Sequence, residues 1–249
     1  MSERFFIPDP PVAGRAVLVG DEARHLVRVL RAKVGDELVV FAGQGGEWPA
    51  RIVRLSRDEA ELETGPERRD RADHGPALTL AVALPKGERQ KWLVEKLTEL
   101  GVARLVPLET ERGVAEATPA ARERLRRGVI EACKQCGRNT LMEIAEPRSV
   151  AEALAERPQG THAIIAHPGG GPLDPAIAAG DARHVLALVG PEGGFTDAEV
   201  AAAERAGAVK ASLGPHILRI ETAAIALAAR LAMNTRMHID ETGRRDSAH

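Results

Sequence analysis

Two glycine-containing segments in the last quarter of the chain have residue types and spacing that suit ligand binding. The first, Gly190-Pro191-Glu192-Gly193-Gly194-Phe195, follows the apolar run 185–189, and the second, 213–223, leads into an alanine-rich helical pattern. Each predicts a strand, a loop and a helix. Ligands bind outside the carboxyl ends of the strands in an open α/β sheet, and glycine lets the backbone approach a ligand closely. We predict that both loops build one binding site.

Polar side chains in these segments are candidates for chemistry. Glu192 and Arg219 stand in the loops, and Glu221 follows in the second segment. A carboxylate can accept a proton there, and a guanidinium can stabilise developing negative charge. The alternatives are a salt bridge between Arg219 and Glu221, and a simple helix-capping turn at Thr196-Asp197-Ala198-Glu199. His167, at another expected strand end, is either catalytic or a loop histidine with a hydrogen-bond partner.

The elements that must position these residues alternate between strand and helix. Strands are expected at 78–84, 104–108 and 163–166, and helices at 88–100 and 120–136. The glycine run 167–171 is expected to end the last of these strands in a loop. Alternating strands and helices predict a parallel α/β sheet.

The first 66 residues have a different pattern, with short strands expected at 15–19, 35–41, 47–55 and 60–63. Several short strands at close spacing predict a small barrel. A charged, apolar-poor segment, 67–76, follows and is a linker by composition. We therefore predict two domains, 1–72 and 73–249.

One helix is expected between the first two of these strands. Arg24, Arg28 and Arg31 recur there at helical spacing, with His25 beside them. Residues at this spacing share one helical face. The face is either a solvated surface or a ridge that contacts phosphates, and the charge pattern alone leaves both open.

Composition narrows the function classes. The chain has 249 residues, 44% of them hydrophobic and 28% charged, and a formal net charge of -2, so any contact with RNA must come from a local basic patch. No apolar stretch approaches the ~20 residues of a membrane span, and the first residues lack the apolar core of a signal peptide. We expect a cytoplasmic protein with no membrane partner.

The sequence lacks the motifs that usually indicate several classes of ligand. The loop after Leu84 lacks the G-x-G-x-x-G pattern of dinucleotide binding, and the chain has no G-K-[ST] of a P-loop. Cys133 and Cys136 form a C-x-x-C without a second cysteine pair, although zinc normally takes four ligands. We interpret them as small residues on one face of a helix that Gly137 caps, and we predict no metal site.

The two glycine segments together resemble the SPOUT class of S-adenosylmethionine-dependent RNA methyltransferases, most closely the RsmE family, which methylates N3 of a uridine in 16S ribosomal RNA. Further matching landmarks are Arg4-Phe5-Phe6, His25 to Arg31, Lys86, 95–101 and 131–138. The resemblance covers nearly the whole chain, and the motif pair is more specific than a single glycine loop.

This resemblance implies an α/β methyltransferase domain with a parallel sheet and a deep trefoil knot, preceded by a small PUA-like RNA-binding β-barrel. It implies a homodimer formed through the C-terminal domain, which acts on the decoding region of the small ribosomal subunit. It also implies that S-adenosylmethionine binds in the knot, in contact with His167, Gly169, Leu188, Gly190, Glu192, Gly194, Leu213, Gly214, Leu218 and Arg219.

Methyl transfer to a uracil N3 needs a group that takes or shares the N3 proton, or that stabilises the charge left on the uracil oxygens. Arg219 is the candidate for the second role, while Glu192 and Glu221 remain equal candidates for the first. The residues expected to contact RNA are Arg4, Arg24, His25, Arg28, Arg31, Lys86 and Arg138. Two rival classes are a non-catalytic RNA-binding adaptor that keeps the knotted fold, and an enzyme for a small molecule.

Overall fold

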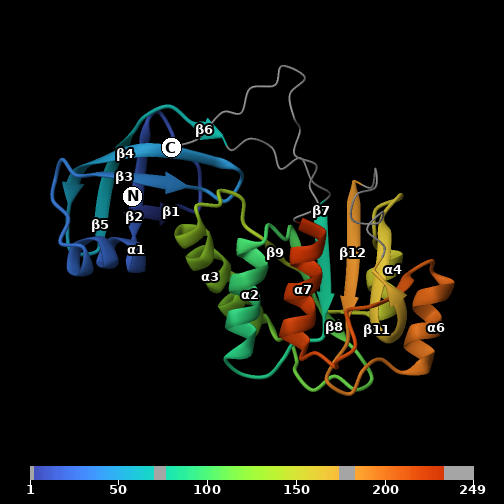
Figure 1. The fold of residues 1–249 in the computed structure, drawn as a ribbon. Coiled ribbons are helices and arrows are strands. Elements are labelled where there is room, and N and C mark those ends of the chain that lie inside the picture. Colours follow the sequence, from blue (N-terminus) through green and yellow to red (C-terminus); the bar gives the residue numbers. More distant parts are fainter. Residues whose placement is uncertain (1–2, 70–76, 174–182, 233–249) are drawn as a thin grey trace.

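The computed structural model describes residues 3–69, 77–173 and 183–232, which form two domains (Figure 1). The last described strand of the N-terminal domain is β6 (Arg68–Arg69), and the C-terminal domain begins with β7 (Ala77–Val82). The boundary that we predicted at residue 72 lies outside the described residues. No helix in the described ranges combines the length and apolar character needed to cross a bilayer.

The N-terminal domain is a six-stranded half-barrel with the strand order β1-β3-β4-β5-β2, in which β6 also pairs with β4. The remaining strands are β1 (Arg4–Phe6), β2 (Arg15–Val19), β3 (Glu37–Phe41), β4 (Gly46–Leu55) and β5 (Glu59–Thr64). This order leaves β1 and β2 as the two edges, so the expected barrel is open. Ala23 and Leu26, from the helical segment between β2 and β3, pack into the same core as the inward side chains of the sheet.

The helix that was expected to carry three arginines on one face is irregular. A short α-helix, α1 (Gly20–Arg24), continues into a π-helix, η1 (His25–Val29). Arg31 lies beyond both and has a φ of 53°, in the left-handed region. A π-helix has a wider turn than an α-helix, so the helical spacing on which the predicted ridge depended does not hold here.

The C-terminal domain is built on a seven-stranded sheet, which confirms the predicted parallel arrangement. Its order is β10-β8-β7-β12-β11-β13, β9 also pairs with β8, and every pair is parallel. Its strands after β7 are β8 (Arg104–Glu109), β9 (Glu143–Ile144), β10 (Arg148–Ser149), β11 (His162–Pro172), β12 (His184–Val189) and β13 (Val209–Ser212).

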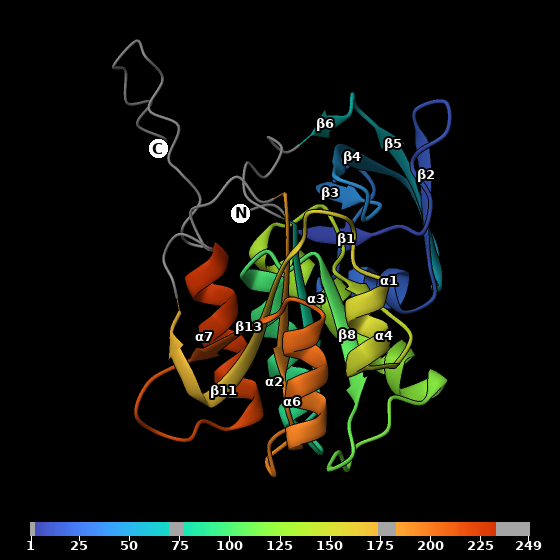
Figure 2. The ribbon, with the colours of Figure 1, turned by 90° about the vertical axis from the view of Figure 1, so that its right-hand side faces the viewer.

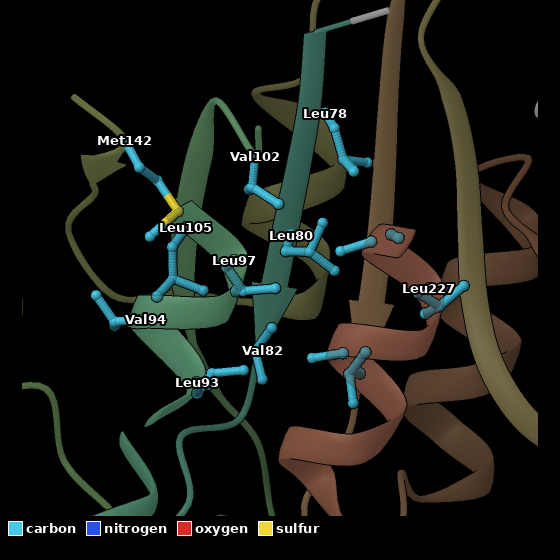
Figure 3. Close-up of a cluster of buried hydrophobic side chains, with 14 of the residues drawn as sticks. Leu78, Leu80, Val82, Leu93, Val94, Leu97, Val102, Leu105, Met142 and Leu227 are labelled. Atoms are coloured by element: carbon cyan, nitrogen blue, oxygen red, sulfur yellow. The ribbon is translucent and has the colours of Figure 1, made fainter. Parts of the chain in front are cut away.

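Helices cover both faces of this sheet and make three layers (Figures 1 and 2). One face carries α2 (Arg89–Glu99), α3 (Pro119–Cys136) and α7 (Ile220–Ala232), and the other carries α4 (Val150–Ala155) and α6 (Asp197–Arg205). Strand β7 is buried on both sides, as parallel strands under two helical layers are. Leu80 and Val82 point into the core with α2 and α7 (Figure 3), whereas Ala81 belongs to the opposite core.

The ends of the helices follow the sequence signals. Thr196 and Glu199 form the capping box that was predicted for α6, and Gly137 ends α3 with a left-handed φ of 83°. Both cysteines at the end of α3 are free, Cys133 buried and Cys136 exposed. Burial raises the pKa of the Cys133 thiol to about 12, so this group stays protonated and unreactive at neutral pH.

The glycine run 167–171 is not the loop that we expected, because β11 continues through it to Pro172. The pairing of β11 with β13 shifts register between Ala166 and Gly171. A Cβ on Gly170 would lie 2.7 Å from backbone atoms of Ala211 in β13. The glycine is therefore needed because two strands approach each other closely, a contact that is invisible to local sequence patterns.

The two domains meet along β1, the turn before β4, and the end of α3. Residues Gln44 and Thr140 form a β-bridge, and the Arg4 guanidinium lies 2.6 Å from Glu47 Oε2, bonds Asn139 and covers the Phe41 ring. We call this contact region the domain joint. It also contains an ion pair between Lys134 of α3 and Glu22 of α1, with Nζ 3.0 Å from Oε1.

Candidate functional site

Strands β11, β12 and β13 are neighbours in the sheet, and a cavity of about 530 Å³ is lined by the middle of β11 and by residues that follow β12 and β13. Figure 2 shows the segments after β12 and β13 at the same end of the domain. This volume lies within the range of about 300–1,000 Å³ that is usual for small-molecule sites. We call it the carboxyl-edge pocket. The two glycine loops thus line one cavity, as their positions after strands predicted.

The pocket has an apolar interior and a polar rim. Its apolar walls come from the middle of β11, from the end of β12, from the loops after β12 and β13 and from the start of α7, namely Ala166, Val189, Phe195, Leu213, Ile217, Leu218, Ile220 and Ala223. Polar side chains of Arg112, His167, Glu192 and Asp197 also border it. Such a site can hold an apolar or aromatic ligand and fix its orientation with a few hydrogen bonds.

Glycine keeps the floor of the pocket open. A Cβ on Gly190 would lie 3.0 Å from the Phe195 ring, and one on Gly193 would lie 3.3 Å from Arg112 Cδ. Gly214 has a φ of 132°, which side chains of other residues rarely allow. These three positions therefore need glycine for two reasons, close approach and backbone conformation.

Local hydrogen bonds shape the pocket walls. The Arg112 guanidinium donates to the Gly193 carbonyl at 2.8 Å, which ties the segment after β8 to the segment after β12. The His167 Nδ1 accepts from the Gly169 N–H at 3.0 Å. The histidine thus has the hydrogen-bond partner that one of our two interpretations required.

Most residues that the resemblance implied for the cofactor do line the pocket: His167, Gly190, Glu192, Gly194, Leu213, Gly214 and Leu218. Three of the implied residues do not border it. Leu188 points into the core under α4 and α6, and its neighbour Val189 faces the cavity instead. Gly169 lies further along β11, and the exposed Arg219 stands just outside, before the first turn of α7.

A cluster of charges lies at the pocket rim. Arg89, at the start of α2, has its Nη1 atom 3.5 Å from Glu192 Oε1 and 3.7 Å from Glu221 Oε2. Glu221 is only 5% exposed, and its Oε2 makes no hydrogen bond. The first turn of a helix stabilises a carboxylate at this position. Arg219 does not pair with Glu221, so the salt bridge that we considered is replaced by one from another element.

Arg89 and Arg112 are functional candidates that the sequence patterns missed. Arg89 follows β7 and Arg112 follows β8, at the same carboxyl edge of the sheet as the glycine loops. A signal for them existed, because each lies within seven residues of the end of an expected strand. Using it requires the strand order, which places β7 next to β12.

The residues predicted to contact RNA fall into two groups. Arg28, Arg31, His25 and Lys86 are exposed, and within the described ranges none of them is ion-paired. The others are held by protein contacts: Arg4 by the domain joint, Arg24 by Asp21 and Asp58, and Arg138 by the carbonyls of Thr98 and Val102. Their positions are therefore explained by the fold.

The described residues contain no group of three or more His, Cys, Asp or Glu side chains arranged to hold a metal ion. The polar side chains in and beside the pocket rim include the carboxylates of Glu192, Asp197 and Glu221, arginines and histidines. Their chemistry is proton acceptance and charge stabilisation.

Comparisons with known proteins agree with this architecture. A family model for an RNA methyltransferase domain matches residues 73–232, and a model for an RNA methyltransferase PUA domain matches residues 18–64. Ribosomal RNA small subunit methyltransferase E from Synechocystis is 34% identical over 223 residues, which cover 87% of this chain and 72% of that protein. The enzyme of the same name from Mycobacterium bovis is 33% identical over 236 residues, 90% of this chain and 89% of that protein.

Solved structures are similar over almost the full length. Ribosomal RNA small subunit methyltransferase E from Neisseria gonorrhoeae, bound to S-adenosyl methionine, has a TM-score of 0.82 and 32% identity, and covers 94% of this chain and 98% of its own. A Legionella pneumophila protein in complex with SAM has a TM-score of 0.85 and 29% identity, with the same coverage. The chain belongs to the RNA methyltransferase family and, within it, to the ribosomal RNA small subunit methyltransferase E (RsmE) family.

Proposed function

We propose that the protein is a cytoplasmic enzyme that transfers a methyl group from S-adenosylmethionine to N3 of a uridine in the decoding region of 16S ribosomal RNA. The observation that carries this proposal is the carboxyl-edge pocket, where two glycine loops and β11 enclose an apolar cavity beside a cluster of charged groups. The relatives named above bind this cofactor or act on small-subunit ribosomal RNA.

The pocket residues fit the cofactor. Val189, Leu213 and Leu218 give an apolar surface for an adenine ring, and loop backbone groups can hydrogen-bond its edge. The space is kept free at Gly190 and Gly193, where a Cβ would meet Phe195 or Arg112. When bound, the cofactor supplies an electrophilic methyl group on a sulfonium. The task left to the protein is to hold the uracil in line and to manage its proton.

Glu192 is our candidate for the group that accepts the N3 proton. It borders the pocket and its side chain is 46% exposed, so a substrate base can reach it. Glu221 is 5% exposed and does not border the pocket, and we assign it the role of orienting Arg89. As the proton passes to Glu192, the N3 electron pair forms the bond to the methyl carbon, and the carbon–sulfur bond breaks with its electrons moving to sulfur.

Arg219 is our candidate for the group that stabilises the substrate. Its side chain is exposed at the start of α7 and makes no ion pair within the described residues. A free guanidinium at this place can bind the uracil oxygens as charge develops on them, or a flanking phosphate. Arg219→Ala is expected to lower methyl transfer while S-adenosylmethionine still binds, and normal transfer would remove Arg219 from the mechanism.

The test combines a binding and a product measurement. Calorimetry should show S-adenosylmethionine binding to the purified protein, and mass spectrometry of 16S ribosomal RNA after reaction should show methyl on N3 of one uridine. A protein that binds RNA without this cofactor would be the adaptor that keeps the fold. Methyl on another atom would keep the methyltransferase class and reject the N3 assignment.

Glu192→Gln sharpens the assignment of the proton acceptor. The amide keeps the shape of the side chain but cannot take a proton, so methyl transfer should fall by about 100-fold or more. Glu199→Gln is not a suitable control because Glu199 caps α6, whereas Glu116→Gln changes an exposed carboxylate outside the pocket lining. Equal rates for Glu192→Gln and Glu116→Gln would exclude Glu192.

We further propose a homodimer formed through the C-terminal domain, as the family resemblance implies. Trp92 on α2 supports an apolar contact there, since 45% of this large side chain is exposed. Light scattering should give twice the mass of one chain. The trefoil knot also stays a prediction of the resemblance.

A further inference from the structure

A second cavity, separate from the carboxyl-edge pocket, lies between α2 and α3 and has a volume of about 710 Å³. We call it the α2–α3 groove. Figure 1 shows the two helices side by side, between the N-terminal domain and α7. Charged and small residues of both helices line it, among them Glu88, Lys91, Arg124, Arg127 and Gly128. No residue of this groove has a role in the chemistry described above.

The cations of the groove are more available than its carboxylates. Lys91 and Arg127 are exposed, and neither forms an ion pair with any described residue. Arg124 donates to the Gln90 side chain rather than to an acid. Two of the three carboxylates have a lysine near them: Glu95 lies 3.5 Å from Lys96 Nζ, and Glu131 lies 3.2 Å from Lys134 Nζ. Among the described residues the groove therefore has three cations without an ion-pair partner and one such carboxylate, Glu88.

The floor of the groove contains a glycine where a helix would not favour one. Gly128 lies in the middle of α3, and glycine in a helix interior is destabilising by roughly 0.5–1 kcal/mol relative to alanine. Its φ is not positive, and a Cβ there would meet only Val94 Cγ1 at 3.6 Å, an ordinary contact. Helix geometry and packing do not require this glycine, and the missing side chain leaves more open space between α2 and α3.

The groove connects two regions that RNA must reach. The helices run in the same direction, because Arg124 bonds Gln90 near the start of α2, and Arg138 bonds Thr98 near its end. One end of the groove is at Gly87 and Glu88, beside Arg89 at the pocket rim. The other end is at Gln135, next to Lys134 of the domain joint.

We propose that the α2–α3 groove holds the phosphate backbone of the RNA substrate on its way from the N-terminal domain to the carboxyl-edge pocket, an inference that rests on the proposed function. Lys91, Arg124 and Arg127 contact successive phosphates, and Gly128 leaves room for the backbone to lie close to α3. Phosphate contacts of this kind position an RNA without reading its sequence.

The test measures binding of 16S ribosomal RNA to the full-length protein at several salt concentrations. Lys91→Glu and Arg127→Glu should each weaken binding about tenfold and make the slope of log K against log salt less steep by roughly 0.7–0.9 for each phosphate that the variant no longer neutralises. Arg205→Glu, at the exposed end of α6 on the opposite helical layer, is the matched control and should change neither quantity.

A second pair of variants tests the open floor. Gly128→Glu and Gly128→Lys add side chains of similar size and opposite charge at a helix position that tolerates both. RNA that lies along the groove predicts much weaker binding for the glutamate variant than for the lysine variant. Equal effects of the two charges would overturn the proposal, and so would slopes for Lys91→Glu and Arg127→Glu that match Arg205→Glu.

The measurements can separate a failure of the groove proposal from a failure of the proposed function. S-adenosylmethionine affinity should be unchanged in all groove variants, since no groove residue borders the pocket. If the wild-type protein binds the cofactor and methylates RNA but the groove variants keep the wild-type salt slope, only the groove proposal fails. A change in oligomeric mass by light scattering, without a change in slope, would identify the groove as a contact between two copies of the chain and would also overturn it.

Discussion

Arginines serve the domain joint and the carboxyl-edge pocket in different ways. At the joint, the Arg4 side chain is 14% exposed, and its two terminal nitrogens bond Glu47 and Asn139. At the pocket, Arg89 is 39% exposed, and its nearest carboxylate oxygens are 3.5 and 3.7 Å away. The first guanidinium is held in short contacts, whereas the second keeps hydrogen-bonding capacity for a ligand.

The exposure of a guanidinium and the length of its contacts distinguish structural from functional arginines better than residue type or sequence position does. A buried polar group stabilises the fold only when it is hydrogen-bonded, so its contacts are short and its partners are other protein groups. A ligand-binding group must be reachable and must have donors to spare.

The largest effect is expected for Gly190→Leu in the pocket. The new side chain must displace the Phe195 ring, which lies 3.0 Å from the position of its Cβ. Overpacking of this kind closes the cavity, and we expect S-adenosylmethionine affinity to fall roughly 100-fold or more in calorimetry. Gly171→Leu is the control, because nothing lies within 4 Å of the Cβ it would introduce. If both variants bind the cofactor equally well, the cavity is not its site.

Arg89→Ala should affect turnover more than binding. The change leaves the Glu221 carboxylate buried beside no cation and frees Glu192 from its partner. Loss of this positioning should lower single-turnover methyl transfer by about 10- to 100-fold, with cofactor affinity changed by less than about threefold. Arg89→Lys should recover part of the rate. A rate equal to the wild-type rate would mean that this cluster has no catalytic role.

Arg4→Ala should act on stability instead of on RNA. It removes a donor from Glu47 and Asn139 and a cation from the face of Phe41. The free energy of unfolding, measured with urea, should fall by about 1–3 kcal/mol. The slope of log K against log salt for RNA binding should stay unchanged. A less steep slope with normal stability would instead indicate that Arg4 contacts RNA.

The smallest effect is expected at the Lys134–Glu22 pair and depends on pH. Desolvation alone would lower the pKa of Lys134, but its hydrogen bond to Glu22 and the charges of Glu22 and Glu131 outweigh it and raise this pKa above 10.5. A raised lysine pKa stabilises the folded state below its unfolded value, and this contribution is lost as pH rises through the folded value. The wild-type protein should lose about 1 kcal/mol or less relative to Lys134→Met above pH 10.5. If the free energies of unfolding of the two proteins change with pH in parallel, the pKa of Lys134 does not contribute to this pH dependence.

Glu22, the acid of the same pair, gives a pH slope of the same sign in a different pH range. Burial raises the pKa of Glu22 above 4.5, although Lys134 opposes the shift. The folded state then holds the proton more tightly than the unfolded state, so Glu22 reduces stability as pH rises from 4.5 through its folded pKa. Glu22→Gln should remove this slope between acid and neutral pH in the same unfolding measurements.

Local signals in the sequence predicted the elements well. The capping box at Thr196, the glycine end of α3 at Gly137 and the apolar strand that became β7 all depend on neighbours in the chain. The two glycine loops could be assigned to strand ends because the apolar runs that precede them are also local signals. Their meeting in one pocket followed from the general rule for α/β sheets.

Contacts between distant segments account for what sequence patterns missed. Position 170 needs glycine because the backbone of Ala211, in another strand, lies against it. Arg89 lies beside the pocket because β7 pairs with β12. Arg4 bonds Asn139, which is 135 residues away in the sequence. The regular helical spacing that we assumed for Arg24, Arg28 and Arg31 was wrong for a local reason, the π-helix at His25–Val29, which no simple residue pattern predicts.

The continuation of β11 through its glycine run has a consequence for ligand binding. Ala166 pairs with Ala211 of β13, and the pairing resumes at Gly171, so the backbone is held on both sides of the part of β11 that lines the pocket. Little of this wall has to be ordered when the cofactor binds. Another wall, from Leu213 to Arg219, is mostly exposed, and the side-chain hydrogen bonds found there among the described residues join only Ser212 and Gly214. The entropic cost of ordering the pocket on binding therefore falls mainly on the segment after β13.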